Sequence, residues 1–559
     1  MPITWFRAAL VLALLASAHS AYAEKVLRRG NGAEPHSIDP HRALTTSENS
    51  VIGDMFMGLY TDDAAGTPVL GAADAVETSK DGLTWTFRIR PHTWSDGSAV
   101  TADDFVFAFL RLLAQETAAE YASILYPVKN ALQVNKGKLE TSKLGVSAPD
   151  PATFVIQLEH PAPYLPQLLT HYTAFPVPKT IVEKFGNAWT RPTNIVVNGP
   201  YKLKAWRPHD HIELVKNPLF YDAANVKIDR VIFYPIDDDS AALKRFRAGE
   251  LETQARWPIS EFKWLSANAP GQARRTTALR LTFVSFNLLK KPFDDLRVRK
   301  AVSLAIDGKT LARDVYQGVY GEAANSFVPA GTANVDHSPQ VEWADWPMEK
   351  RLALSRRLLA DAGYGPGRTL KFTYRFIGNT DIKRGAVALQ AMWRKAGIDV
   401  EVQASEEKVH WNLLEVRDFE VAYNAWLFDY NDAKNLFLMF QAAAAQLNNS
   451  AYESAKFESL LHQADSEPDV QVRAKLLGQA NAVLLADLPS VPLMFPFQRH
   501  LVKNHVLNWS ENARDVNRTR WLDLDKKAVT VSSEAAPGGF WSWLGSWFSA
   551  DAWSKWWNS

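Results

Sequence analysis

The segment between Met348 and Ser405 restricts the fold of this chain more than any other part of its sequence. The spacing of its apolar residues predicts a helix over 348–362, a strand over 370–376, a helix over 382–397 and a strand over 398–403. Gly363 and Gly397 follow the two helices, as is common at helix C-termini. Strands joined by a helix are typical of a parallel sheet with helical cover, so the sequence predicts an α/β fold.

The length of the chain predicts several lobes. A chain of 559 residues exceeds what one hydrophobic core supports and allows roughly three to five lobes. No repeat, low-complexity tract or long Gly/Ser linker interrupts residues 24–530. We therefore expect lobes between which the chain passes back and forth.

The charge balance argues against nucleic acid as a partner. The chain has 62 basic and 61 acidic residues and a formal net charge of +1, so it has no global field that attracts a polyanion. It contains no cysteine, which excludes disulfides, thiol chemistry and cysteine-based zinc sites.

The first 23 residues have the pattern of a secretory signal peptide. Arg7 precedes the apolar stretch 8–16, which is too short to cross a bilayer, and Ala21-Tyr-Ala23 provides a small-residue cleavage site. We expect cleavage after Ala23. Because no cysteine can carry a lipid anchor, the protein should be free in a bacterial periplasm, with full secretion to the medium as the alternative.

The last twenty residues differ from the rest of the chain. They follow the small-residue stretch 532–539 and hold six tryptophans, at positions 541, 543, 547, 553, 556 and 557. Tryptophan favours the membrane interface, which would suit a helix lying in the membrane surface. Lys555 is the only basic residue there, so docking onto the protein itself or disorder is the competing interpretation.

The sequence contains no convincing catalytic motif. It has no G-x-S-x-G, H-E-x-x-H, P-loop or EF-hand pattern. Two polar clusters are weak metal candidates: residues 237–239 are better explained as a solvated acidic loop, and His36, Asp39 and His41 as an irregular segment bounded by proline. We therefore expect a binding protein that is not an enzyme and needs no metal and no cofactor.

The stretch AWLFDYND, residues 425–432, places Asp429 among aromatic and aliphatic side chains. A carboxylate removed from water needs a cation or several hydrogen-bond donors, and no lysine or arginine lies within four residues of Asp429. From the residues alone, two interpretations stand equally: Asp429 meets a charged ligand, or it caps a helix that begins at Asn431.

Four separated segments resemble one protein family, in the same order along the chain. The chain is similar over about residues 25–525 to the oligopeptide- and dipeptide-binding proteins of ABC importers, the family 5 extracellular solute-binding proteins. The matching segments are RGNGAEPHSIDPH (29–41), WSDGSAVTADDF (94–105), NGPYKL (198–203) and PFDDLRVRKA (292–301) with AID (305–307).

The resemblance implies two large α/β lobes that close on a ligand about a hinge, as in periplasmic binding proteins, with a smaller extra lobe. It implies partners as well: short peptides as ligands and the permease subunits of an ABC importer, with ATP hydrolysed by other subunits. We expect a monomer. The expected division is a signal peptide over 1–23, lobe I over 24–56, 180–282 and 497–530, lobe II over 57–179, lobe III over 283–496 and a Trp-rich tail over 531–559.

The resemblance also implies site residues. Residues 426–430 match a W-x-x-D-Y setting in which an aspartate takes the α-ammonium of a bound peptide, which assigns that role to Asp429 and places Trp426 and Tyr430 beside it. Tyr121 matches a tyrosine that faces the ligand, although it and Trp426 could equally be core aromatics. Lys383 is a candidate for the ligand carboxylate, with a solvated position at a helix start as the alternative.

The sequence thus predicts a periplasmic receptor that captures short peptides for an ABC importer. Alternatives within the same class are a receptor for murein peptide or for a non-peptide solute such as an opine, haem or a nickel chelate. From other classes, a secreted peptide hydrolase and a membrane-associated role of the Trp-rich tail remain open.

Overall fold

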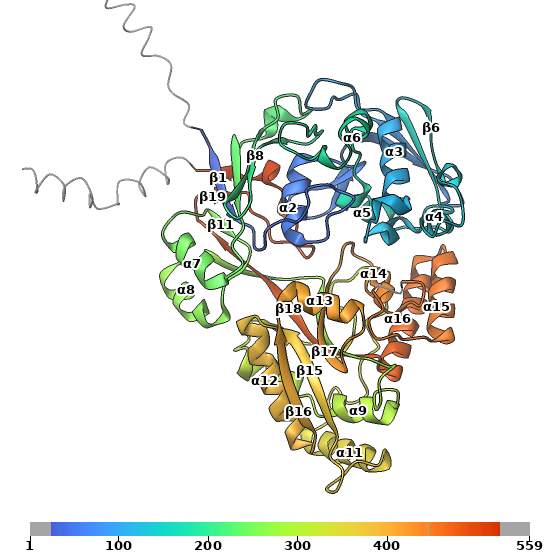
Figure 1. Cartoon of the computed structure of the whole chain (residues 1–559), viewed down its shortest axis with the longest axis vertical. Coiled ribbons are helices and arrows are strands. Elements are labelled where there is room, and N and C mark those ends of the chain that lie inside the picture. Colours follow the sequence, from blue (N-terminus) through green and yellow to red (C-terminus); the bar gives the residue numbers. More distant parts are fainter. Residues whose placement is uncertain (1–23, 445–446, 526–559) are drawn as a thin grey trace, which may run out of the picture.

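One strand near the C-terminus, β18 (Ser490–Val502), joins the two halves of the molecule. The computed structural model describes residues 24–444 and 447–525. Residues 490–494 of β18 pair with β13 (Arg280–Phe286), whereas residues 497–502 pair with β12 (Ala273–Thr277) and β11 (Thr253–Gln254). Figure 1 shows β18 passing from an upper body, which holds β1 to β10 with α2 to α6, into a lower body, which holds β13 to β17 with α9 to α16.

The sheet around β18 has twelve strands in mixed orientation. Its order is β16-β15-β17-β13-β18-β11-β1-β10-β9-β8, with β12 and β14 paired to β18. Its remaining strands are β1 (Val26–Gly30), β8 (Tyr201–Arg207), β9 (His211–Lys216), β10 (Arg230–Tyr234), β14 (Gly321–Ala323), β15 (Lys371–Ile377), β16 (Asp399–Ser405) and β17 (Val421–Leu427).

The upper body also contains a four-stranded sheet, β4-β5-β7-β6, and a short pair, β2 with β3. A further pair, β19 with β20, closes the described part of the chain. These strands are β2 (Tyr60–Asp62), β3 (Pro68–Leu70), β4 (Ala73–Thr78), β5 (Thr84–Ile89), β6 (Val146–Asp150), β7 (Thr153–Gln157), β19 (Val506–Leu507) and β20 (Asp523–Leu524).

Helices cover the sheets of both bodies (Figure 1). In the upper body and at its junction these are α2 (Thr46–Met55), α3 (Ala102–Leu113), α4 (Ala131–Asn135), α5 (Leu165–Leu168), α6 (Lys179–Phe185), α7 (Asp239–Arg247) and α8 (Phe262–Asn268). In the lower body they are α9 (Leu296–Leu304), α10 (Gly308–Thr310), α11 (Met348–Asp361), α12 (Thr380–Lys395), α13 (Glu407–Glu415), α14 (Ala433–Phe437), α15 (Ala455–Ser466) and α16 (Val470–Asp487). Two single turns matter below, η2 (Ala122–Leu125) and η4 (Tyr172–Ala174).

The strand and helix alternation predicted for 348–405 is confirmed. The elements α11, β15, α12 and β16 follow in that order, and β15 pairs with β16 in parallel from Lys371 with Asp399 to Ile377 with Ser405. Gly363 and Gly397, which follow the two helices, have φ of +85° and +84°, a conformation that glycine adopts without steric cost.

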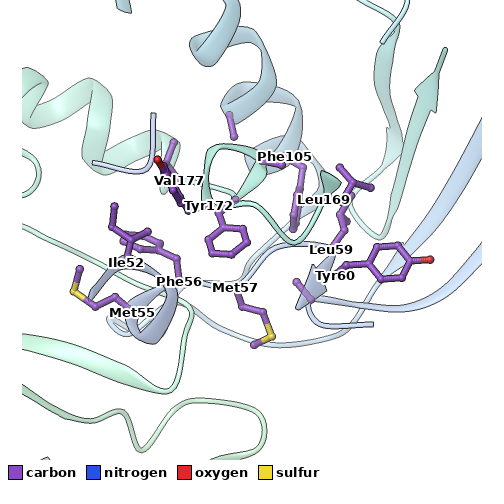
Figure 2. Packing of buried hydrophobic residues seen from close by; sticks show 14 of the residues in the cluster. Ile52, Met55, Phe56, Met57, Leu59, Tyr60, Phe105, Leu169, Tyr172 and Val177 are labelled. Atoms are coloured by element: carbon purple, nitrogen blue, oxygen red, sulfur yellow. The ribbon is translucent and has the colours of Figure 1, made fainter. Parts of the chain in front are cut away.

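The apolar residues form separate cores. In the upper body the chain around α2 packs Phe56, Met57 and Leu59 against Phe105 and Tyr172, as Figure 2 shows. In the lower body the alternation along β13 sends Val284 and Phe286 into one cluster, and Leu281 and Phe283 into another with α14 to α16. Both faces of β13 are therefore buried.

Two of the expected lobe boundaries fall inside continuous strands. The boundary at 282/283 lies within β13, and the boundary at 496/497 lies within β18. The division into lobes stays a prediction, and a hinge at these positions would be built from strands. The expected signal peptide and the Trp-rich tail lie outside the described residues.

No helix in the described part of the chain is both long and apolar enough to cross a lipid bilayer.

Candidate functional site

Asp429 lies in the short loop between β17 and α14. The helix begins at Ala433, and its N-cap is Asp432, whose side chain accepts a hydrogen bond from the Lys434 N–H at 3.0 Å. The interpretation of Asp429 as the cap of this helix is therefore wrong, because the capping position falls three residues later. Asp432 also forms a buried ion pair with Arg473, with N–O distances of 2.7 and 3.1 Å.

Asn435 on α14 holds the Asp429 loop in place. Its Oδ1 accepts hydrogen bonds from Trp426 Nε1 at 2.7 Å and from the Asp429 N–H at 3.1 Å, while its Nδ2 donates to Asp429 Oδ2 at 3.1 Å. A single amide thus fixes the end of β17, the loop backbone and the carboxylate together. Trp426 is half-buried beside it.

The Asp429 carboxylate has no full cationic partner among the described residues. The side chain is 15% exposed, and the nearest ring nitrogen, His171 Nε2, lies 3.7 Å from Oδ1. Burial raises the pKa of Asp429 to about 6, although the Asn435 hydrogen bond and the charge of Arg514 lower it. Burial also lowers the pKa of His171 to about 3, so this imidazole is neutral at neutral pH and leaves the carboxylate uncompensated.

Residues of the upper body complete the surroundings of Asp429. Tyr121, at the start of η2, places its ring 5.4 Å from the His171 ring, centroid to centroid. The pKa of the Tyr121 hydroxyl is raised by burial and then by the negative charge of Asp429. Arg514 donates to the Asp429 backbone carbonyl at 3.0 Å, and its charge is taken by an ion pair with Asp62.

The two bodies touch directly beside this loop. Tyr430 stacks on Tyr164 with ring centroids 5.2 Å apart and planes 9° apart. The Asn431 N–H donates to Gln167 Oε1 at 2.6 Å. Tyr430 is thus buried between the bodies next to Asp429.

The strand that leads to Asp429 has one edge without a β partner. β17 pairs with β13 along its whole length, but with β15 only at Val421 and Ala422. On that side the described residues provide only local contacts, from His410 Nε2 to the Tyr423 carbonyl at 2.9 Å and from the Ala425 N–H to the Asn424 side chain at 2.8 Å. An extended ligand can pair with such an edge through its main chain.

Lys383 lies apart from this cluster. It is exposed on α12, and its side chain forms no ion pair within the described part of the chain. A separate cavity of about 400 Å³ lies between α10, α11 and β18, and none of the five predicted site residues lines it. We place the candidate site at Asp429 because its buried carboxylate, which has no full cationic partner among the described residues, lies at the end of the β17 edge that has no β partner there.

The two weak metal candidates have other structural roles. Asp39 forms an ion pair with Arg111 at 2.6 Å and accepts from Trp189 Nε1 at 3.0 Å. Asp238 caps α7 by accepting from the Ala241 N–H at 2.6 Å. Within residues 24–444 and 447–525 no group of side chains has a geometry that could hold a metal ion.

Three residues of this site were not singled out from the sequence: Asn435, His171 and Arg514. Asn435 had a usable signal, since it is the polar start of the apolar run 435–440. His171 and Arg514 reach the site from distant parts of the chain and carry no local signal.

Comparisons with known proteins give a consistent result. The model for "Bacterial extracellular solute-binding proteins, family 5 Middle" matches residues 67–448. The chain is 35% identical over 486 residues to the periplasmic oligopeptide-binding protein OppA of Salmonella typhimurium, covering 86% of this chain and 89% of that protein. It is 32% identical over 498 residues to the periplasmic murein peptide-binding protein MppA of Escherichia coli, covering 88% and 92%.

Solved structures agree over the same range. Haemophilus influenzae OppA in complex with the peptide RPPGFSPFR superposes with a TM-score of 0.84 at 32% identity, covering 90% of this chain and 99% of that one. E. coli MppA gives 0.84 at 31% identity with the same coverage, whereas its unliganded open form gives 0.70, covering 90% and 98%. This chain is thus more similar overall to the former MppA structure than to the unliganded open form.

Proposed function

The chain belongs to the bacterial extracellular solute-binding proteins of family 5, and from this premise we propose that it captures short peptides by their free α-ammonium and main chain. It delivers them to the permease of an ABC-type importer and has no chemistry of its own. Relatives whose names state a periplasmic location support the periplasm as its compartment.

The observation that carries this proposal is the uncompensated carboxylate of Asp429 at the end of an unpaired strand edge. A buried carboxylate with a pKa of about 6 gains a charge-assisted hydrogen bond when an ammonium arrives, and its pKa then falls. The edge of β17 offers main-chain pairing that does not depend on the ligand's side chains. Both features suit a ligand with an amine at one end and an extended backbone.

The other predicted residues have supporting roles in this proposal. Trp426 and Tyr121 flank the ammonium position, and Tyr430 closes the site between the two bodies. Murein peptide is the second candidate ligand, favoured by the likeness to MppA, and it would satisfy Asp429 only through a free amine.

The test is calorimetric titration of ligand-stripped protein with di-, tri-, tetra- and pentapeptides, each free and N-acetylated. We expect acetylation to weaken binding by about 30-fold or more, because truncating one member of a buried charge pair costs about 2–5 kcal/mol. Asp429→Asn should weaken binding of the free peptides by a similar factor and make it indifferent to acetylation.

The matched control is Glu407→Gln, which neutralises an exposed carboxylate on α13 and should leave binding unchanged. Tight binding that ignores both acetylation and Asp429→Asn would remove Asp429 from its role. Absence of binding to every peptide would reject peptides as the ligand.

A further inference from the structure

A cavity of about 400 Å³ lies in the lower body and is separate from the Asp429 loop. It lies between α10, the start of α11 and residues 491–493 of β18, and Ala324 and Asn325, which follow β14, complete its wall. Asp429 follows β17, and β13 separates β17 from β18 in the sheet. The volume is that of a pocket for a small organic molecule.

Apolar and aromatic side chains form one part of the cavity wall. Trp343 is buried and Trp346 half-buried, so two indole rings border the same space. Val341, Val491 and Leu493 add aliphatic surface. Aromatic rings pack favourably against a second ring, whether stacked or edge to face, so this wall suits a ligand with a flat apolar body.

All but one of the charged side chains that line the cavity already have partners. Asp307 caps α10, since its carboxylate accepts from the Thr310 N–H at 3.0 Å and from Thr310 Oγ1 at 2.7 Å. Lys309 and Asp345 form an exposed ion pair at 3.4 Å. Arg313 is 74% exposed and pairs with the carboxylate of the next residue. These groups are therefore paired or solvated without a ligand.

Arg351 is the exception. This residue is 9% exposed, and its Nε donates to the Leu304 carbonyl at 3.1 Å and its Nη2 to the Ile306 carbonyl, both at the C-terminal end of α9. Within residues 24–444 and 447–525 it forms no ion pair, and its Nη1 has no hydrogen-bond partner. Burial lowers the pKa of Arg351, although the charge of Asp307 raises it. Capping of α9 thus uses two of the three nitrogens and leaves a buried charge without an anion.

Two further hydrogen-bond donors line the cavity with Arg351. The Asn325 side-chain amide and the Trp343 indole N–H donate to no acceptor in the part of the chain that the structure describes. An ionised carboxylate has only acceptor sites, so it complements a wall whose spare groups are donors.

We propose that this cavity binds a small organic anion with one carboxylate on a flat apolar body. The carboxylate meets Arg351, with Asn325 and Trp343 as further donors, and the apolar body packs against the rings of Trp343 and Trp346. The inference does not rest on the proposed function, since the cavity shares no residue with the Asp429 site.

The test is calorimetric titration of the ligand-stripped protein with phenylacetate and with its neutral isostere phenylacetamide. On the native chain we expect the carboxylate to bind at least about tenfold more tightly than the amide, because an ionised acceptor forms a charge-assisted hydrogen bond with the buried guanidinium. A saturating tetrapeptide should not displace phenylacetate, because the two sites are separate.

Three variants sharpen this test. Arg351→Met keeps an apolar chain and removes the charge, so it should bind phenylacetate and phenylacetamide equally. Arg357→Met is the matched control and should keep the full preference for the acid, because this arginine lies on the same helix, is 79% exposed and does not line the cavity. Ala344→Trp fills the cavity from its wall and should abolish binding of both probes.

Equal binding of the acid and the amide to the native chain, or no binding of either probe, would overturn the inference. So would a preference for the acid that survives Arg351→Met. Displacement of phenylacetate by the tetrapeptide would place the probe at the Asp429 loop and overturn it as well. Because Arg351 also caps α9, its substitution can impair folding; the acid-to-amide comparison on the native chain and Ala344→Trp then decide the question without it.

Discussion

At the scale of the residue, Asp429, for which we propose a role in ligand binding, carries a cost in stability. Its carboxylate is buried against Asn435 and a neutral His171, and this burial raises the pKa of Asp429 to about 6 because the ionised form is poorly solvated. From the apolar neighbours of Asp429, the sequence predicted that its carboxylate is withdrawn from water and needs a partner. It could not predict the pKa, because the burial that raises it and the charge of Arg514 that lowers it come from parts of the chain more than 80 residues away.

We expect Asp429→Asn to stabilise the ligand-free protein at pH 8 and to have little effect near pH 4. The folded-state pKa of about 6 lies above the unfolded value of 3.8, so the native carboxyl binds its proton more tightly than the unfolded one. Its contribution to stability is fully present below about pH 4 and is lost as the pH rises through 6. The upper bound on the gain is about 3 kcal/mol. Thermal unfolding of both proteins between pH 4 and 8 measures it, and a variant that is less stable than the native chain at pH 8 would contradict this account.

At the scale of the element, the local units were predictable and the long-range pairings were not. The order α11, β15, α12, β16 follows from apolar spacing within about 60 residues. The pairing of Thr282 with Met494 brings together strands more than 200 residues apart, and nothing in either segment specifies the other. For the same reason the sequence could not predict the role of Asn435. This residue hydrogen-bonds to Trp426 and Asp429 only once α14 folds back against the end of β17.

The Asp432–Arg473 pair fixes the element that carries Asn435. Arg473 is 1% exposed and Asp432 fully buried, so Arg473→Met leaves a buried carboxylate without its cation at the N-terminus of α14. We expect a loss of about 3–5 kcal/mol in the free energy of unfolding, measured by denaturant titration. Arg313→Met is the control, because this guanidinium is 74% exposed in its pair with Asp314 and its loss should leave the unfolding midpoint unchanged. Equal effects of the two substitutions would show that the buried pair does not anchor α14.

At the scale of the whole molecule, the two bodies meet around the site. Contacts between Tyr430 and Tyr164, and between Asn431 and Gln167, bring the Asp429 loop against the upper body. The higher TM-score with E. coli MppA than with its unliganded open form fits this contact. β18 runs through the junction, so opening would bend a continuous strand instead of unfolding a linker.

We expect the ligand-stripped protein to be more expanded in solution than the peptide-bound protein. Small-angle X-ray scattering should show a decrease in the radius of gyration on addition of a saturating peptide, because ligand that bridges both bodies favours their contact. Asp429→Asn at the same peptide concentration should show no such decrease. An unchanged radius of gyration in the native protein would mean that the bodies do not move apart.

The position of β18 has a consequence for the order in which the chain acquires its structure during synthesis. This strand is made among the last residues of the chain, yet it lies between β13 and β11 in the middle of the main sheet. A growing chain, extended at about 5–20 residues per second, cannot close that sheet until residues 490–502 have been synthesised. The central core is therefore completed late in synthesis, after the strands of the upper body have left the ribosome.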